Sequence, residues 1–220
     1  MMVVDRHLLV LVALSFVFLV TPAMAGGDVN VFFGQRSISD DDLEDLEVDE
    51  PDQFGVVVSL DFDWPVALAI DLLSSSDDNS ETFVYQYPGY TYTVKYKVDV
   101  DILELDVGVR KFWGEKLRPY VGGGLAYAQL DGQLKADAMF DPGPEFSFTL
   151  LDDSDSDIGF WLNGGFVYTL RRFNVGVDIR YSDASADLAL KPLTPGDPSP
   201  GSVGVDSGGT QYGIVLGYHW

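Results

Sequence analysis

The chain ends on TQYGIVLGYHW, residues Thr210 to Trp220, in which apolar residues alternate with small or polar ones. The apolar positions are Tyr212, Ile214, Leu216, Tyr218 and Trp220, and Gln211, Gly213, Gly217 and His219 fall between them. Successive side chains of a β-strand point to opposite faces, so a period of two separates the residues by face. The segment therefore predicts a strand with one apolar face and one small or polar face.

Seven earlier segments show the same alternation. The expected strands are residues 28–36, 54–63, 66–74, 100–111, 118–129, 158–169, 174–181 and 209–220. Three connections are tight, at residues 64–65, 112–117 and 170–173, and the four between them run for roughly 16 to 28 residues. Short turns that alternate with long loops are typical of exported barrels. We expect an all-β fold: an eight-stranded, antiparallel, up-and-down transmembrane β-barrel with four long extracellular loops and three short periplasmic turns.

The beginning of the chain predicts export. Arg6 is followed by an apolar run from Leu8 to Val20, and Ala23-Met24-Ala25 has the small-x-small pattern of a cleavage site. These features indicate a secretory signal peptide at residues 1–25, cleaved after Ala25. The apolar run is shorter than the ~20 residues that a membrane-spanning helix needs. Residues 26–220 are then one barrel domain, and the expected location is the cell outer membrane.

The period of two also assigns faces. The residues assigned to lipid are Val56, Val58, Leu60, Phe62, Val66, Leu68, Ile70, Leu72, Leu103, Leu105, Val107, Val109, Val175, Val177, Ile179 and Tyr181. The charged residues between them should form an ion-pair network inside the barrel: Asp61, Asp71, Glu104, Asp106, Arg110, Asp178 and Arg180. A soluble sandwich would reverse the two faces, but the signal peptide and the loop asymmetry favour the barrel. An eight-stranded barrel is only wide enough for its side chains, so we favour a packed interior, with a narrow passive, porin-like channel as the alternative.

Negative charge gathers in the loops. The net charge is -22, and the four long loops hold 24 acidic residues against four lysines. Such a surface disfavours a nucleic-acid partner. The densest runs, Asp40 to Glu50 and Asp152 to Asp157, are either a solvated, repulsive surface or a place for divalent cations. Three alternating carboxylates, Asp153, Asp155 and Asp157, match the first ligand places of a calcium loop, yet Ile158 and Gly164 stand where its glycine and bidentate acid belong. An EF-hand is rejected, and divalent binding by these three residues stays open.

The second long loop contains ETFVYQYPGYTYTVKYK, residues 81–97. Pro88-Gly89 is a two-residue turn, and counting outward from it pairs Tyr87 with Tyr90, Tyr85 with Tyr92 and Phe83 with Val94. The sequence thus predicts a hairpin above the membrane whose aromatic wall consists of Phe83, Tyr85, Tyr87, Tyr90 and Tyr92. These rings either only stabilise the hairpin or pack on a neighbouring loop, or they form a contact surface for a glycan, lipopolysaccharide, or a host or phage protein. A second such hairpin is expected around residues 141–144, near Phe140, Phe146 and Phe148.

Three stretches resemble a known family. GVRKFW at residues 108–113, LRPYVGGGLAYAQ at 117–129 and VNVFFGQR at 29–36, with the aromatic last strand, are similar to the small outer-membrane β-barrels, the OmpA-like and OmpX-like transmembrane domains. The resemblance implies that the barrel assembly machinery reads the last strand through Gly213, Leu216, Tyr218 and Trp220. It also implies outer-membrane lipid and lipopolysaccharide as surroundings. Because the chain stops at Trp220, we expect no peptidoglycan-binding domain.

Catalysis finds little support in the residues. After removal of the signal peptide, His219 is the only histidine, and the sequence contains no cysteine. Small barrels that modify lipid A use a histidine with a serine and an acid near the outer leaflet, and that set is missing. A lipid-modifying barrel enzyme is therefore the most distant alternative. We expect a monomeric, non-enzymatic structural or surface-interaction protein without a cofactor, acting through its acidic and aromatic extracellular loops.

Overall fold

The structure is a computed structural model that describes residues 26–37, 51–192 and 201–220. Its described elements are all strands: β1 (Gly26–Ser37), β2 (Asp52–Asp61), β3 (Ala67–Tyr87), β4 (Tyr90–Phe112), β5 (Leu117–Asp141), β6 (Glu145–Leu170), β7 (Phe173–Asp183), β8 (Ser185–Ala189), β9 (Ser202–Asp206) and β10 (Gly209–His219). Within these ranges, no helix is long and apolar enough to span a membrane.

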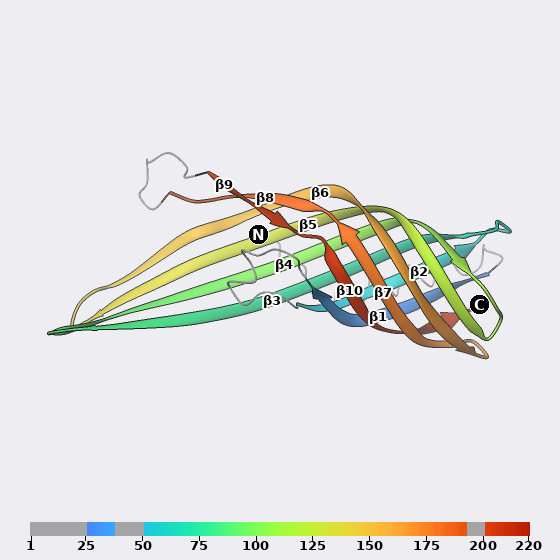
Figure 1. The fold of residues 1–220 in the computed structure, drawn as a ribbon, viewed down its shortest axis with the longest axis horizontal. Helices are drawn as coiled ribbons and strands as arrows, with labels where there is room; N and C mark the ends of the chain where they lie inside the picture. The colour runs from blue at the N-terminus through green and yellow to red at the C-terminus, as the bar shows by residue number, and fades with distance from the viewer. Residues whose placement is uncertain (1–25, 38–50, 193–200) are drawn as a thin grey trace.

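Eight of the strands close into a barrel, in the order β1-β10-β7-β6-β5-β4-β3-β2. Every neighbouring pair is antiparallel, and the first and last strands join from Asp28 opposite His219 to Ser37 opposite Thr210. The short connections follow β2, β4 and β6 and lie together at the end of the barrel near the C-terminus (Figure 1). The predicted eight-stranded, up-and-down topology is confirmed.

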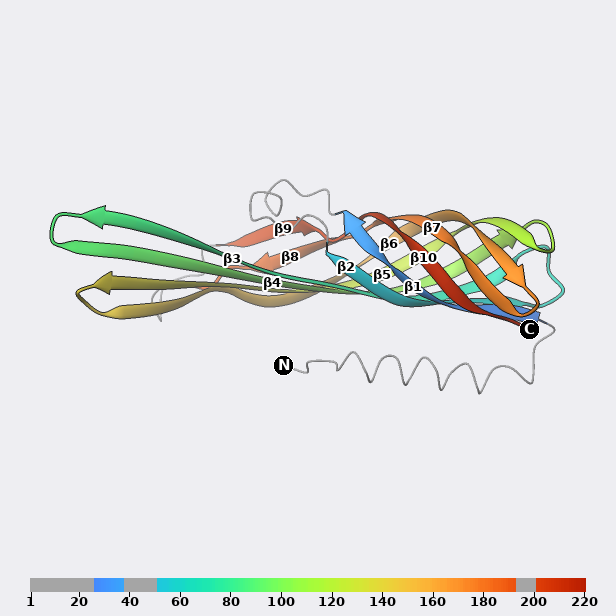
Figure 2. The same cartoon turned by 90° about the horizontal axis from the view of Figure 1, so that it is seen from below.

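Four strands rise far above the rest of the barrel (Figures 1 and 2). β3, β4, β5 and β6 have 21, 23, 25 and 26 residues, whereas a membrane-spanning strand needs about 9 to 11. Much of what the sequence predicted as the second and third loops is therefore extended sheet, including the acidic run Asp152 to Asp157 within β6. The sequence-based boundaries fell where apolar alternation stops. Main-chain pairing continues past that point because it needs no lipid on either face.

The tips of the extended sheet are two hairpins. In the first, Tyr87 lies opposite Tyr90 and Phe83 opposite Val94, so the predicted register is confirmed. The second hairpin joins β5 to β6 at residues 142–144, where we expected it. β5 and β6 shift register once, between Leu134 and Lys135.

The last long connection contains an element that the sequence did not reveal. β8 and β9 form a two-stranded sheet of their own, with Ser185 opposite Asp206 and Ala189 opposite Ser202. This small sheet lies against the inner face of the rising strands (Figures 1 and 2). The middle of this connection, residues 193–200, lies outside the described residues.

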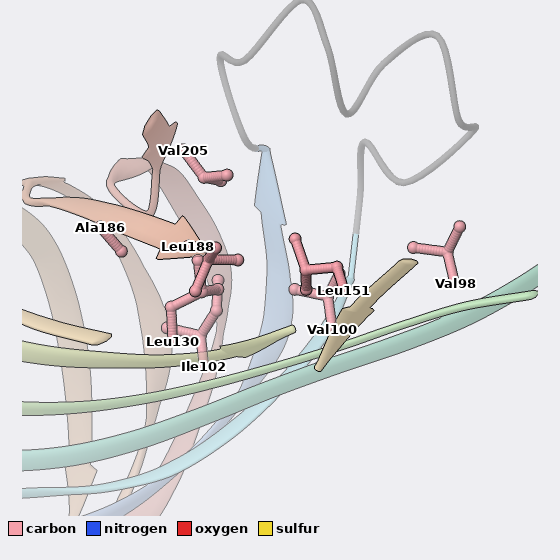
Figure 3. Packing of buried hydrophobic residues seen from close by; sticks show 8 residues of the cluster. All are labelled: Val98, Val100, Ile102, Leu130, Leu151, Ala186, Leu188 and Val205. Atoms are coloured by element: carbon pink, nitrogen blue, oxygen red, sulfur yellow. The ribbon is translucent and has the colours of Figure 1, made fainter. Parts of the chain in front are cut away.

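The core changes character along the barrel axis. Within the membrane zone the inner residues include buried charges beside a smaller apolar cluster with Phe32, Val57 and Leu73. The residues that face outward, as predicted, include Leu105, Val107 and Val109 of β4 and Val175, Val177 and Ile179 of β7. Above it, an aliphatic cluster lies between the rising strands and β8–β9 (Figure 3), and its buried members are Val98, Val100, Ile102, Leu130, Leu151, Ala186, Leu188 and Val205. We call it the aliphatic cap. It covers the extracellular end of the polar interior.

Candidate functional sites: the barrel interior and the extracellular sheet

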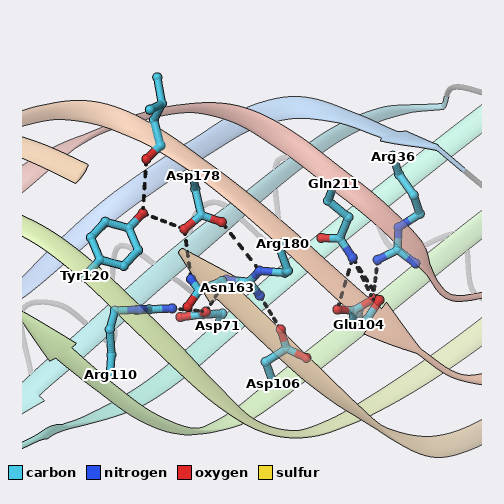
Figure 4. Close-up of polar contacts among 12 residues, drawn as sticks. Arg36, Asp71, Glu104, Asp106, Arg110, Tyr120, Asn163, Asp178, Arg180 and Gln211 are labelled. Carbon is cyan, nitrogen blue, oxygen red and sulfur yellow. Dashed lines mark hydrogen bonds and ion pairs between the residues drawn. The ribbon is translucent and has the colours of Figure 1, made fainter. Parts of the chain in front are cut away.

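The centre of the barrel interior is a charge network around Arg180 (Figure 4). Arg180 on β7 reaches Asp71 on β3 with its Nη2 atom 2.5 Å from Oδ2, and its Nη1 atom bonds to Asp106 on β4. Arg110 on β4 donates to the same Asp71 oxygen at 2.6 Å and to the Ser59 hydroxyl at 2.9 Å. Two guanidinium groups therefore share one fully buried carboxylate, and buried charges are retained where they pair in this way.

A second carboxylate extends the network sideways. Asp178 accepts a hydrogen bond from the Tyr120 hydroxyl at 2.5 Å and from the Asn163 amide at 2.8 Å, and Arg180 Nε lies 3.8 Å from it. The ring of Trp161, also fully buried, lies 5.1 Å below the Arg180 guanidinium. Aromatic and charged side chains are therefore buried together inside the barrel.

The extracellular end of the interior has its own ion pair. Arg36 on β1 bonds to Glu104 on β4 and donates to the Ser207 carbonyl at 2.6 Å. Gln211 and Ser182 also donate to Glu104, at 3.3 and 3.1 Å. We did not single out Arg36 from the sequence, although its even number places it on the inner face of β1 with Asn30 and Phe32.

The periplasmic end is held by a third group. Arg118 on β5 donates two hydrogen bonds of 2.8 Å to Asp28 on β1, and His219 Nδ1 lies 3.1 Å from the same carboxylate. Asn174 adds a further bond at 2.8 Å. Asp61, predicted to belong to the network, lies instead at the rim of this end, beside a hollow of about 410 Å³. Within the described residues it makes no ion pair, although Arg110 and Arg118 line the same hollow.

Six of the seven predicted interior residues thus come together, and Asp61 does not. Residues that we had not included in the prediction complete the interior: Asp28, Arg36, Arg118, Tyr120 and Trp161. The alternation of inward-facing and outward-facing positions along each strand was the sequence signal that could have identified them. Their hydrogen bonds join opposite walls of the barrel, and the aliphatic cap closes the end above them. The arrangement is that of a packed, hydrogen-bonded interior that ties the walls of the barrel together.

The second candidate site is the aromatic wall of the extracellular sheet. All five predicted residues share one face: Tyr87 stacks on Tyr90 with ring centroids 5.1 Å apart, and Tyr85 on Tyr92 at 6.0 Å. The wall continues onto the neighbouring strands, because Phe140 on β5 lies 4.7 Å from Tyr92. Phe146 and Phe148 on β6 extend it further.

This wall remains open to solvent. Phe83, Tyr85, Tyr87 and Tyr90 are between 42% and 51% exposed although each contacts another aromatic ring. The same face continues downward into the aliphatic cap through Val94 and Val98, which are buried. Tyr96, which pairs edge-on with Phe83 at 5.9 Å, is a member of the wall that we had not predicted.

The acidic run of β6 has a structural role. Asp153, Asp155 and Asp157 accept hydrogen bonds from the backbone amides of Ala189, Asp187 and Ser185 on β8, at 2.8, 2.9 and 3.3 Å. The amide hydrogen bonds hold the pKa of the Asp155 carboxyl below its ordinary value. We had considered these three residues for divalent ions. In the described part of the chain, no group of three or more His, Asp or Glu side chains is placed to hold a metal, and the first acidic run, residues 40–50, lies outside the described residues.

The residues expected to guide assembly lie along β10. Leu216 points outward and is 44% exposed, and Tyr218 lies opposite Val29 of β1. Gly213 faces Gly34 across the same seam, where an added Cβ would meet the Phe33 carbonyl at 2.3 Å. The Trp220 amide donates to the Gly27 carbonyl at 3.1 Å. These residues close the barrel, and this structural role is separate from any recognition by the assembly machinery.

Comparison with known proteins agrees with the geometry. The family model of the outer membrane protein beta-barrel domain matches residues 9–218, so the chain belongs to this family of outer-membrane β-barrels. The outer membrane is accordingly its location. A comparison of the sequence with curated proteins found no match.

The chain is also similar to several solved structures. They include Neisserial surface protein A, with 11% identity, 88% of this chain and 94% of that chain covered and a TM-score of 0.39. The attachment invasion locus protein Ail of Yersinia pestis, in complex with the heparin analogue sucrose octasulfate, has 11% identity, covers 90% and 99%, and has a TM-score of 0.36. The N-terminal barrel domain of Pseudomonas aeruginosa OprF has 13% identity, covers 90% and 98%, and also has a TM-score of 0.36.

Proposed function

We propose that this outer-membrane protein is a surface-interaction protein that binds an extracellular partner through the aromatic wall of β3–β6. The observation that carries the proposal is the position of that wall. Stacked rings extend from Tyr87 and Tyr90 at the tip to Phe148 on β6, on one face of a sheet that rises above the barrel (Figure 2). Tyrosine and phenylalanine supply large contact area at a low cost in conformational entropy.

Packing within the hairpin explains only part of this surface. If the rings served only to stabilise the hairpin, cross-strand pairs such as Tyr85 with Tyr92 would suffice. The wall instead crosses from β4 to β5 and β6, and several of its rings keep about half of their surface in water. Contiguous exposed apolar patches mark interaction sites on soluble surfaces.

Chemistry narrows the classes of partner. Lipopolysaccharide, a glycan, or a host or phage protein would each reach a wall that projects from the membrane. The loops carry 24 acidic residues against four lysines, so a polyanion such as the sulfated glycan analogue bound by the Yersinia pestis protein would be repelled. The packed interior supports a binding role over the alternative of a narrow channel.

The test uses intact cells that display the protein. A wall variant with Tyr85→Ser, Tyr87→Ser and Tyr90→Ser is compared with a control variant of the opposite face, Val84→Ser, Gln86→Ser and Thr91→Ser. Both variants change the same hairpin, and the control leaves the wall intact. Binding is scored on immobilised lipopolysaccharide, neutral glycans and host surface proteins.

We expect the wall variant to lose binding at least tenfold to whichever class the native protein binds, and the control to keep it. Single-channel conductance in planar bilayers is measured on the same proteins. Equal loss in both variants would contradict the proposal, and steady conductance of the native protein would favour the channel.

A further inference from the structure

The aromatic wall has a pocket at its base. Glu81 on β3 lies directly opposite Tyr96 on β4, and Phe83 lies edge-on to Tyr96 with ring centroids 5.9 Å apart. These three side chains, with Val98 and Leu134 below them, line a hollow of about 310 Å³. A carboxylate and two aromatic rings therefore border one cavity that has an aliphatic floor.

The neighbouring strand keeps this pocket open. Ala136 lies opposite Tyr96, and Ala138 opposite Val94, so β5 brings no bulky side chain over the Tyr96 ring. The register shift between Leu134 and Lys135 falls just beside the pocket. The polar residues Asn79 and Ser80 form its rim.

No basic side chain of the described residues neutralises the pocket. Lys97 lies on the opposite face of the sheet, where it pairs with Asp137 at 2.8 Å, and Lys135 donates to Gln133 on that same face. Glu81 has no ion-pair partner in the described part of the chain. A cation between a carboxylate and aromatic faces is favoured both by Coulomb attraction and by the ring quadrupoles.

We propose that this pocket receives a lysine or arginine side chain of a cationic polypeptide that lies along the aromatic wall, an inference that rests on the proposed binding function of the wall. The apolar side chains of the partner stack on Tyr85, Tyr87 and Tyr90, while its basic residue enters beside Glu81. The long cationic side chains suit a pocket with an aliphatic floor because their methylene stems bury against apolar surface. A second copy of this chain is disfavoured as the occupant because it carries the same net charge of -22.

The experiment uses the full barrel in nanodiscs of neutral phospholipid. The probe is a fluorescent ten-residue peptide in which lysine alternates with leucine, and its counterpart replaces each lysine with glutamate. Fluorescence anisotropy should show binding of the lysine peptide alone. Glu81→Gln, which keeps the shape of the side chain, should weaken binding about five- to tenfold, and Tyr96→Leu by a similar factor.

Asp99→Asn is the matched control. It removes one negative charge from the exposed outer face of the same sheet, opposite Asp78 and Gln133, and should change binding less than twofold. Retained heat-modifiable migration on gels verifies that each variant is folded. Equal weakening by Glu81→Gln and Asp99→Asn would overturn the pocket, because diffuse net charge would then explain the attraction.

Comparison of the anisotropy results with the cell-binding assay of the wall variant separates this inference from the proposed function. If the lysine peptide fails to bind while the wall variant loses binding to a neutral glycan, the cationic partner is wrong and the wall function stands. If the wall variant alters binding to no ligand, both are wrong. Binding of both peptides alike would also overturn the inference, since charge would then play no part.

Discussion

One face of β4 crosses two environments. In the membrane zone its inward residues are Glu104, Asp106 and Arg110, and above it they are Val98, Val100 and Ile102. The outward face shows the reverse, with Leu105, Val107 and Val109 below and Asp99 and Asp101 above. The direction in which each side chain points never changes. What changes is the outer solvent, from lipid to water, and the inner face takes the opposite polarity in each zone.

The two zones are consequently stabilised in different ways. The barrel relies on ring closure and on ion pairs in a water-poor interior, where an unpaired charge is costly. The extracellular sheet relies on burial of apolar surface from water. Substitutions in one zone should therefore leave the structure of the other zone intact. The following experiments test this independence, from the largest expected effect to the smallest.

Deleting Tyr218 to Trp220 should abolish the folded protein. The deletion removes the pairing of Val29 with Tyr218 and of Asp28 with His219 that closes the seam, and the resemblance to the small barrels adds a loss of recognition by the assembly machinery. Heat-modifiable migration and outer-membrane fractionation measure the result. A deletion of the hairpin tip, residues 83–92, should leave both unchanged, and normal folding of the first variant would refute the role given to the last strand.

Arg180→Leu should destabilise the barrel by about 3 to 5 kcal/mol, because it leaves buried carboxylates without their partner. Asp71 and Asp106 both bond to this guanidinium. A urea titration in lipid vesicles gives the free energy of unfolding. Arg171→Leu, at an exposed position of the β6–β7 turn, is the control and should change little. Similar stability of the two variants would mean that the network is not structural.

A charge on the outer face tests the position of the membrane directly. Val107→Arg should cost roughly 2 to 4 kcal/mol, the price of a cation on the lipid face near mid-membrane. Asp99→Arg, eight residues earlier on the same face, should cost less than about 0.5 kcal/mol because that position meets water. The two urea midpoints are compared, and equal effects would place the membrane boundary elsewhere.

Leu188→Ala should loosen β8–β9 without opening the barrel. Leu188 is 4% exposed within the aliphatic cap, and the truncation should cost about 2 kcal/mol, the lower end of the usual range for a buried leucine. Limited proteolysis between residues 185 and 206 should accelerate, with heat-modifiable migration unchanged. Leu162→Ala, on the lipid-facing side of β6, should leave the cleavage rate unaltered. Unchanged cleavage in the Leu188 variant would show that the cap does not hold this sheet.

The aspartate contacts between β6 and β8 should give the smallest effect. Asp155→Ala should speed hydrogen exchange at the Asp187 amide, which loses its 2.9 Å bond, while Asp155→Asn keeps an acceptor and much of the protection. Because the folded pKa of Asp155 is lowered, its contribution is present at neutral pH and is lost as the pH falls through that lowered pKa. NMR of the carboxyl carbon should titrate below the ordinary value of 3.8. A midpoint above it would contradict the amide contacts.

The sequence alone determined a large part of this protein. The period of two gave the strands, the inner and outer faces of the membrane zone and the registration of the Tyr85 hairpin, since strand periodicity and a two-residue turn are local properties. Loop asymmetry gave the orientation of the barrel. Six of the seven charged residues that parity assigned to the interior lie in it together.

Only the tertiary structure decided the rest. Arg36 pairs with Glu104, and Arg118 pairs with Asp28, in each case far away in the chain. No local pattern shows which residues meet across a barrel. The sequence of residues 153–157 predicted a polar loop, yet these aspartates lie within a strand because β5 pairs with them. Backbone amides of β8 also donate hydrogen bonds to their side chains. Likewise, the pocket beside Glu81 depends on the pairing of β4 with β5, which places the small side chain of Ala136 opposite Tyr96. Periodicity identifies the face of a side chain, but only the register of distant strands decides what lies across from it.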